Sequence, residues 1–141
     1  MAEFDLKRFA DAQKGDYEIA REEIRKGKKR SHWMWYIFPQ IRGLGRSSMA
    51  YRYGIESLEE ARAYLADPVL GGNLREISGI LLELETNDAY RVFGSPDDMK
   101  LRSSMTLFAL VSEEGSVFHG VLDKFFGGRM DSRTLQMLGL K

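Results

Sequence analysis

The residues best suited to chemistry lie in one stretch, where cationic side chains are followed closely by two indole rings. Lys28 and Arg30 precede Trp33 and Trp35, with His32 between them. Cations can neutralise the phosphates of a ligand while an indole stacks on its base or sugar. The alternative is that the tryptophans fill the core, because large aromatic side chains usually serve burial. Since Trp33 and Trp35 lie on different sides of a short helix, we expect at least one of them in the core.

His32 is the best single candidate for acid–base chemistry. It is one of two histidines, the other being His119, and it lies between a charged run and an aromatic run. An imidazole can act as a general base or as a hydrogen-bond donor near physiological pH. The alternative is a structural hydrogen bond at a helix start, the commoner role of a lone histidine. Two isolated histidines without a metal-binding spacing give no reason to expect a metal ion.

A second candidate is the glycine-containing segment 43–48, with the sequence GLGRSS. Glycines permit a nest of backbone N–H groups that binds anions, and a following helix N-terminus adds its dipole. Arg46 and Ser47 would complete the contacts to such an anion. The pattern is neither a Walker motif nor a dinucleotide-binding fingerprint, so a plain turn is an equally good interpretation.

A polar stripe forms the third candidate, on a helix predicted to run from about residue 97 to about residue 111. Asp97, Lys100 and Ser104 fall on one face at i, i+3 and i+7, with Ser103 nearby. This stripe could line one wall of a pocket opposite the basic segment. The simpler interpretation is a solvent-facing Asp97–Lys100 pair that contributes about 0.2–0.5 kcal/mol.

The charge of the chain is unevenly distributed, although its 21 basic and 21 acidic residues cancel. Residues 25–52 hold eight basic side chains and no Asp or Glu, so the rest of the chain carries 13 basic and 21 acidic residues. Such a segment can hold an anion, or it can dock on the acidic remainder of the same fold. Both interpretations stay open, and the neutral total argues against nucleic acid as a partner.

Helix start and stop signals recur along the chain and predict an all-α fold. Ser57 and Glu60 have capping-box spacing, and Asp67–Pro68 is a cap followed by proline at the first helical position. The segment 33–38 (WMWYIF) could be a buried strand, but a short buried helix is the better prediction because no second convincing strand is present. The signals predict about six to eight short helices, which begin near residues 6, 16, 31, 57, 67, 95, 116 and 131.

Composition narrows the class of protein. The 141 residues, 43% of them hydrophobic, predict one domain over residues 1–141 with a single core. The absence of cysteine excludes disulfides, thiolate metal sites and cysteine nucleophiles. There is neither a long apolar run nor an export signal, so we expect a cytoplasmic protein that has no membrane contact and needs no cofactor.

A long motif, residues 27–40 (GKKRSHWMWYIFPQ), is followed by residues 43–47 (GLGRS). On this motif the sequence resembles a bacterial family designated domain of unknown function 1810. Further matching segments cover nearly the whole chain and comprise residues 60–61, 64–65, 68–71, 93–97, 100–101, 103–108 and 131–135. The family usually has His-Pro where this chain has Asp67–Pro68, which argues against a role for a histidine there.

The resemblance implies an all-α fold of several short helices packed as one unit, but it implies no established activity. Some family members carry the name calpastatin, a protease inhibitor, and nothing in these residues supports inhibition. Fold analogy alone would not supply a reaction.

From the residues we expect a cleft for a small phosphate-bearing or otherwise anionic ligand, such as a nucleotide, between the segments Lys28–Tyr51 and Asp97–Thr106. In an enzyme, His32 or Asp97 would be the acid–base group. The expected ligand-binding residues are Lys28, Arg30, Trp33, Trp35, Gln40, Arg46, Ser47, Tyr51, Lys100, Ser103 and Ser104. The alternative is a non-catalytic module that binds a protein of unknown identity or a nucleic acid. Salt dependence separates the two, because polymer binding through phosphates weakens steeply with salt.

Overall fold

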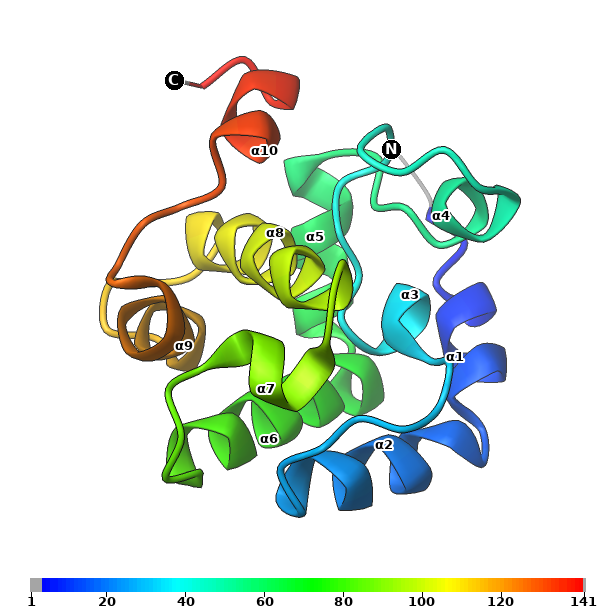
Figure 1. The fold of residues 1–141 in the computed structure, drawn as a ribbon. Helices are drawn as coiled ribbons and strands as arrows, with labels where there is room; N and C mark the ends of the chain where they lie inside the picture. Colours follow the sequence, from blue (N-terminus) through cyan, green and yellow to red (C-terminus); the bar gives the residue numbers. More distant parts are fainter. Residues whose placement is uncertain (1–3, 141) are drawn as a thin grey trace.

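The computed structural model describes residues 4–140 and shows an all-α fold of ten helices within this range (Figure 1). In chain order the helices are α1 (Lys7–Gln13), α2 (Asp16–Arg25), α3 (Met34–Ile37), α4 (Ser48–Arg52), α5 (Leu58–Ala66), α6 (Pro68–Glu83), α7 (Ala89–Phe93), α8 (Asp97–Leu110), α9 (Val117–Phe126) and α10 (Ser132–Met137). The number exceeds the six to eight expected because α4 and α7, at five residues each, are too short for apolar periodicity to reveal them.

Side-chain caps explain where most helices begin. The hydroxyl of Ser57 accepts a hydrogen bond from the backbone N–H of Glu60, and a carboxylate oxygen of Asp67 accepts two, from Val69 and Leu70. Ser116 and Asp131 cap α9 and α10 in the same way, and these four starts confirm the sequence signals. The helices expected to start near residues 16 and 95 have no side-chain cap: α2 begins at Asp16, after Gly15, and α8 begins at Asp97, after the Ser95–Pro96 turn.

The segment 33–38 contains the short helix α3 and no strand, as predicted. Gly71 and Gly72 lie within α6, which is continuous from Pro68 to Glu83. A Cβ at Gly71 would clash with the backbone carbonyl oxygen of Leu65. Glycine is therefore required for the close packing of α5 on α6.

Helix α8 forms the centre of the core, and α5, α7, α9 and α10 surround it (Figure 1). All residues from Ser103 to Ala109 are buried, so this part of the helix is covered on every side. A continuous series of aromatic contacts crosses the core from α1 to α9: Phe9 to Tyr64 at 5.1 Å, Tyr64 to Phe108 at 5.3 Å and Phe108 to Phe118 at 5.9 Å between ring centroids. Rings at these separations pack favourably beyond simple burial.

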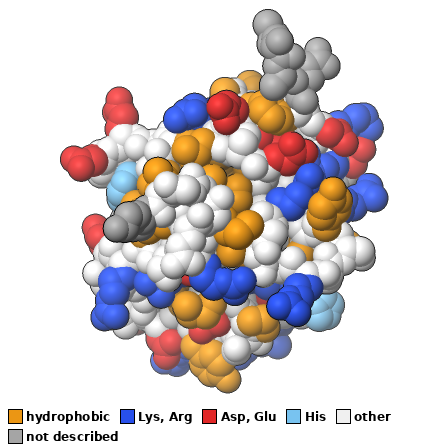
Figure 2. Space-filling view, turned by 90° about the horizontal axis from the view of Figure 1, so that it is seen from above, with side chains coloured by type: hydrophobic (Ala, Val, Ile, Leu, Met, Phe, Trp, Pro, Cys, Tyr) orange, Lys and Arg blue, Asp and Glu red, His pale blue; other side chains and the backbone are white. Residues whose placement is uncertain are grey.

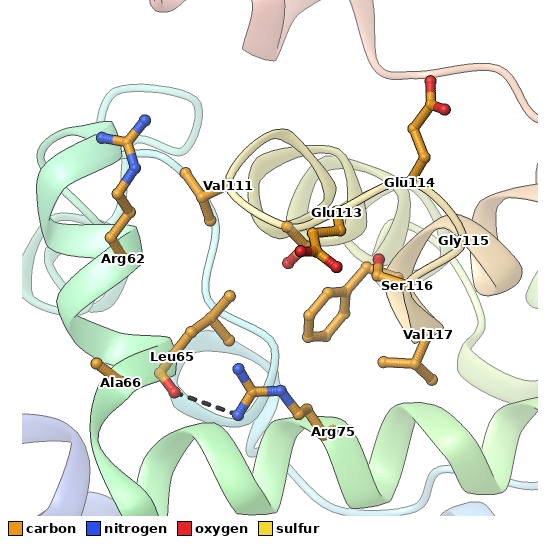
Figure 3. Close-up of a pocket in the computed structure, with 12 residues that line it drawn as sticks. Arg62, Leu65, Ala66, Arg75, Val111, Glu113, Glu114, Gly115, Ser116 and Val117 are labelled. Atoms are coloured by element: carbon orange, nitrogen blue, oxygen red, sulfur yellow. Dashed lines mark hydrogen bonds between the residues drawn. The ribbon is translucent and has the colours of Figure 1, made fainter.

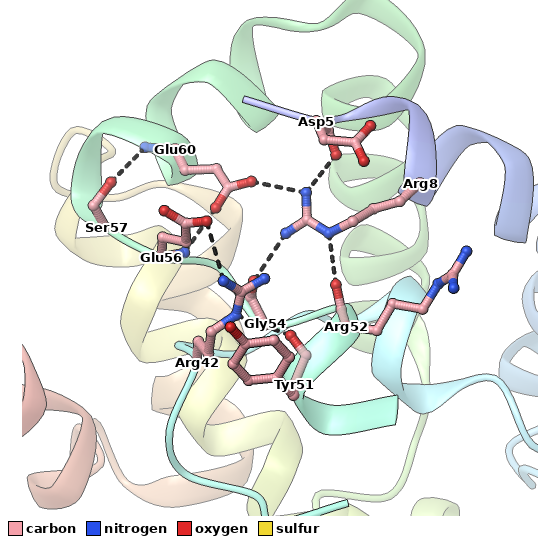
Figure 4. Close-up of polar contacts among 9 residues, drawn as sticks. All are labelled: Asp5, Arg8, Arg42, Tyr51, Arg52, Gly54, Glu56, Ser57 and Glu60. Carbon is pink, nitrogen blue, oxygen red and sulfur yellow. Dashed lines mark hydrogen bonds and ion pairs between the residues drawn. The ribbon is translucent and has the colours of Figure 1, made fainter. Parts of the chain in front are cut away.

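A buried arginine joins α1 to the segment around α4 and α5 (Figure 4). The Arg8 guanidinium lies 3.0 Å from the Glu60 carboxylate and also donates to the backbone oxygens of Arg52 and Gly54 and to that of Asp5. The other carboxylate oxygen of Glu60 accepts from the backbone N–H of Glu56 at 2.7 Å. Each charged group is therefore paired, as burial requires.

Candidate functional site

The two segments expected to form the site do meet, at one ion pair and one cation–π contact. The ammonium of Lys29 lies 2.9 Å from the Asp97 carboxylate at the start of α8. The ammonium of Lys100, one turn further along α8, lies 5.3 Å from the centre of the Trp35 ring and 3.7 Å from Asp97. The charges of the two segments therefore compensate each other across the junction.

The space that remains at this junction is very small. Trp35, Gln40 and Lys100 line a recess of about 10 Å³ together with Met34, Phe38, Ala50, Tyr53 and Gly54. A cavity needs roughly 10–15 Å³ to hold one water molecule. The nucleotide-sized cleft expected between the segments is therefore filled by packed side chains in this structure.

Trp33 belongs to the core, with 1% of its surface exposed, which answers the question that its sequence position left open. Its indole N–H donates to the carboxylate of Glu23 at 2.9 Å, and the same carboxylate accepts from the backbone of Arg30 and from the hydroxyl of Ser31. Partial burial raises the pKa of Glu23, but these hydrogen bonds outweigh it and hold the pKa below its usual value. Glu23 is thus an anchor of the basic loop that sequence reasoning missed.

The serines of the polar stripe face the protein interior. Ser103 is buried and its hydroxyl donates to the backbone oxygen of Met99 at 3.3 Å. Ser104 is completely buried, and its hydroxyl has no hydrogen-bond partner within residues 4–140. Neither hydroxyl reaches a surface where a ligand could contact it in this structure.

The other expected site residues lie at the surface and are not brought together. His32 and Arg46 are exposed, and the side chain of Ser47 is occupied as the cap of α4. Tyr51 is exposed, and the Arg42 guanidinium lies 4.4 Å from the centre of its ring. Figure 2 looks down on the end of the molecule that carries α4 and α10, and shows Lys and Arg side chains spread over this face with hydrophobic side chains between them.

The glycines of segment 43–48 have packing roles. A Cβ at Gly45 would lie 2.6 Å from that of Ala50 in α4. Gly43 has φ of +109°, and a Cβ there would meet the Met137 methyl group in α10 at 2.4 Å. Tight packing and a positive φ thus account for both glycines without an anion.

Positive charge does gather at one groove, which we call the basic groove and define by Lys26, Lys28, Arg30 and Arg91. It has a volume of about 700 Å³ and is further lined by Gly27, Leu84, Glu85 and Thr86. The backbone N–H of Lys29 donates to the carbonyl of Val92 at 2.8 Å, which fixes the loop after α2 against α7. Arg91 lies more than sixty positions after Lys28, so no local sequence pattern could have assigned it to this groove.

The four cations of the basic groove are exposed, and none of them makes a salt bridge within the part of the chain that the structure describes. Their charges are therefore available to a ligand. The neighbouring groove of about 420 Å³ shares Lys26, Lys28 and Arg30 but contains Glu18, Glu22 and Glu23 on its other side. The positive potential is thus concentrated on the side of Arg91.

No helix among residues 4–140 combines the length and the apolar character that crossing a membrane would require. The same residues include no cluster of three or more histidine, aspartate or glutamate side chains placed to hold a metal ion.

Comparison with known proteins places the chain in a family. No curated protein matches the sequence. The fold is similar to the crystal structure of a conserved hypothetical protein from Mycobacterium tuberculosis, with a TM-score of 0.94 and 49% sequence identity over 98% of this chain and 99% of the other. Residues 3–138 match the model of a family described as a protein of unknown function, DUF1810. The chain therefore belongs to the DUF1810 family.

Proposed function

We propose that the protein binds a small phosphate-bearing or similar anionic ligand in the basic groove. The observation that carries this proposal is the convergence of Lys26, Lys28, Arg30 and Arg91 on one open volume of about 700 Å³ that contains a single carboxylate, Glu85. Four unpaired cations repel one another, and an anion that enters the groove removes this repulsion.

The chemistry of the groove suits a phosphate more than a carboxylate. Two of the four cations are guanidinium groups, which can donate two parallel hydrogen bonds to a phosphate, and the lysines add mobile point charges. The volume lies within the range of roughly 300–1,000 Å³ typical of small-molecule sites. A nucleoside diphosphate or a sugar phosphate would fit.

The proposal is limited to binding. Asp97, suggested by the sequence as an acid–base group, is held by Lys29 and Lys100 and does not line the basic groove. His32 is exposed and lines neither this groove nor the recess at Trp35. No pair of groups beside the basic groove therefore supports a specific reaction.

Calorimetric titration with pyrophosphate and with ADP tests the proposal. At about 50 mM salt, where surface charges are weakly screened, the wild-type protein should bind one equivalent of pyrophosphate. Lys28→Glu and Arg91→Glu should each weaken this binding at least about tenfold, equivalent to about 1.4 kcal/mol. Lys14→Glu is the matched control. This substitution changes the net charge by the same amount, and Lys14 is exposed and lines neither groove.

Equal losses in all three variants would show that only net charge matters, and no saturable binding by the wild type would refute the proposal. The alternative function, binding of nucleic acid, predicts a steeper loss of affinity with salt. Affinity for a single-stranded oligonucleotide should then exceed that for pyrophosphate and fall steeply between about 50 and 200 mM salt. The balanced net charge of the chain favours the small ligand.

A further inference from the structure

A second groove, beyond the C-terminal end of α8 and sharing no residue with the basic groove, combines both signs of charge with an apolar floor (Figure 3). Its volume is about 640 Å³. Arg62 comes from α5, Arg75 from α6, and Glu113 and Glu114 from the loop between α8 and α9. Figure 3 shows Glu113 directed into the groove and Arg75 near its floor, whereas Arg62 and Glu114 extend outward at its rim. We call it the mixed-charge groove and define it by these four residues.

The charged side chains of the mixed-charge groove are not paired with one another. Within residues 4–140, none of the four makes a salt bridge, although both signs line the same groove. Arg75 is held by one hydrogen bond to the backbone oxygen of Leu65 at 3.2 Å, which uses one of its five N–H groups. Most of its donors therefore remain available for a carboxylate.

The floor of the mixed-charge groove is hydrophobic. Leu65 and Phe118 are buried, and Val111 and Val117 are partly exposed beside them. An apolar group laid on this floor would gain roughly 25 cal/mol for each Å² of its surface removed from water. The groove thus offers a cation, an anion and an apolar surface to one ligand.

We infer that the mixed-charge groove binds a short peptide with free termini and an apolar side chain. The carboxylate of the peptide would lie against Arg75, its ammonium group against Glu113, and its apolar side chain on the partly exposed Val111 and Val117. A single amino acid would leave most of the 640 Å³ empty, whereas each further extended residue adds about 3.3–3.6 Å of length. The volume has room for a peptide of about two to four residues. The inference does not depend on the proposed function, because the two grooves share no residue.

Calorimetric titration with alanyl-leucyl-alanine and its blocked forms tests this inference. The wild-type protein should bind the free tripeptide saturably, and either N-acetylation or C-terminal amidation should weaken binding about tenfold, because each removes one charged end. In Arg75→Ala, C-terminal amidation of the tripeptide should no longer weaken binding, whereas N-acetylation should still do so. In Glu113→Ala, acetylation should no longer weaken binding, whereas amidation should still do so. This crossed pattern is specific to the assigned orientation of the peptide.

Arg133→Ala is the matched control, since Arg133 is exposed and does not line the groove. Its affinity for the tripeptide should equal that of the wild type. If Arg75→Ala loses its cooperative thermal transition, Arg75→Gln makes the same test, because it removes the charge and keeps a hydrogen-bond donor for the backbone oxygen of Leu65. Absence of saturable binding up to about 10 mM, or equal affinity for free and doubly blocked peptide, overturns the inference.

Discussion

The ammonium of Lys29 lies 2.9 Å from the carboxylate of Asp97, with only 9% and 18% of the two side chains exposed. This pair joins the basic segment after α2 to the start of α8, and the same ammonium lies 5.1 Å from the centre of the Trp33 ring. Positive charge in the segment is thus divided between two roles. Lys29 serves the fold, whereas Lys28 and Arg30 on either side of it face the basic groove.

We expect removal of either partner of the Lys29–Asp97 pair to destabilise the protein by about 2–4 kcal/mol, because the remaining charge is left largely buried without its counter-ion. The measurement is the free energy of unfolding of Lys29→Met, Asp97→Asn and the double variant in urea. The double variant should lose less than the sum of the single ones. Lys7→Met, at an exposed pair with 80% and 54% exposure, should change stability by less than about 1 kcal/mol.

The buried pair of Arg8 and Glu60 should be more sensitive. Glu60→Gln leaves the Arg8 guanidinium without a counter-ion and should cost about 3–5 kcal/mol. Arg8→Lys retains the charge but cannot reach the backbone oxygens of Arg52 and Gly54 together with Glu60, so it should also destabilise. Thermal unfolding measures both. A midpoint for Glu60→Gln within 2 °C of wild type, roughly the shift of a few tenths of a kcal/mol, would contradict this prediction.

Glu23 should make stability depend on pH in acid. Its pKa is lower in the folded protein than the ordinary value of 4.5, so its contribution is fully present above that value and is lost as pH falls through the folded pKa. Glu23→Gln should therefore be less stable than wild type near pH 7, by about 1–2 kcal/mol for hydrogen bonds to a charged group. The difference should shrink below pH 4.5. Glu59→Gln, at an exposed position, should show no comparable change between these pH values.

Ser104→Ala should leave stability unchanged or raise it by up to about 1 kcal/mol, because the buried hydroxyl has no partner within the described residues and its removal relieves a desolvation penalty. Thr106→Val on the same helix is the contrasting variant. The Thr106 hydroxyl donates to the backbone oxygen of Arg102 at 2.8 Å and accepts from the N–H of Asp131 at 2.8 Å. Its loss should cost about 1–3 kcal/mol. Urea unfolding measures the free energy of unfolding of both variants. A large loss of stability in Ser104→Ala would contradict this prediction.

Local sequence determined much of the fold. Caps such as Ser57 and Asp67 act within three residues, and apolar periodicity acts within a few turns, so all-α structure and most helix starts could be predicted. The short helices α4 and α7 escaped prediction because five residues contain too little periodicity. A short buried helix between about Ser31 and Pro39 could be predicted because the sequence offers no second strand to pair with this aromatic segment, and the structure has α3 there, over Met34–Ile37.

Only the tertiary structure decided which charged side chains form ion pairs and which face an open groove. Lys28, Lys29 and Arg30 are adjacent and chemically alike, yet only Lys29 meets Asp97, and only the other two meet Arg91 around an open groove. It also decided that Ser103 and Ser104 are core residues, since a polar stripe on one helix gives no information on which helices cover it. Burial and pairing depend on residues that are far apart along the chain. The sequence therefore identified the basic segment as unusual, and only the packing of α7 and α8 against it separated structural cations from those available to a ligand.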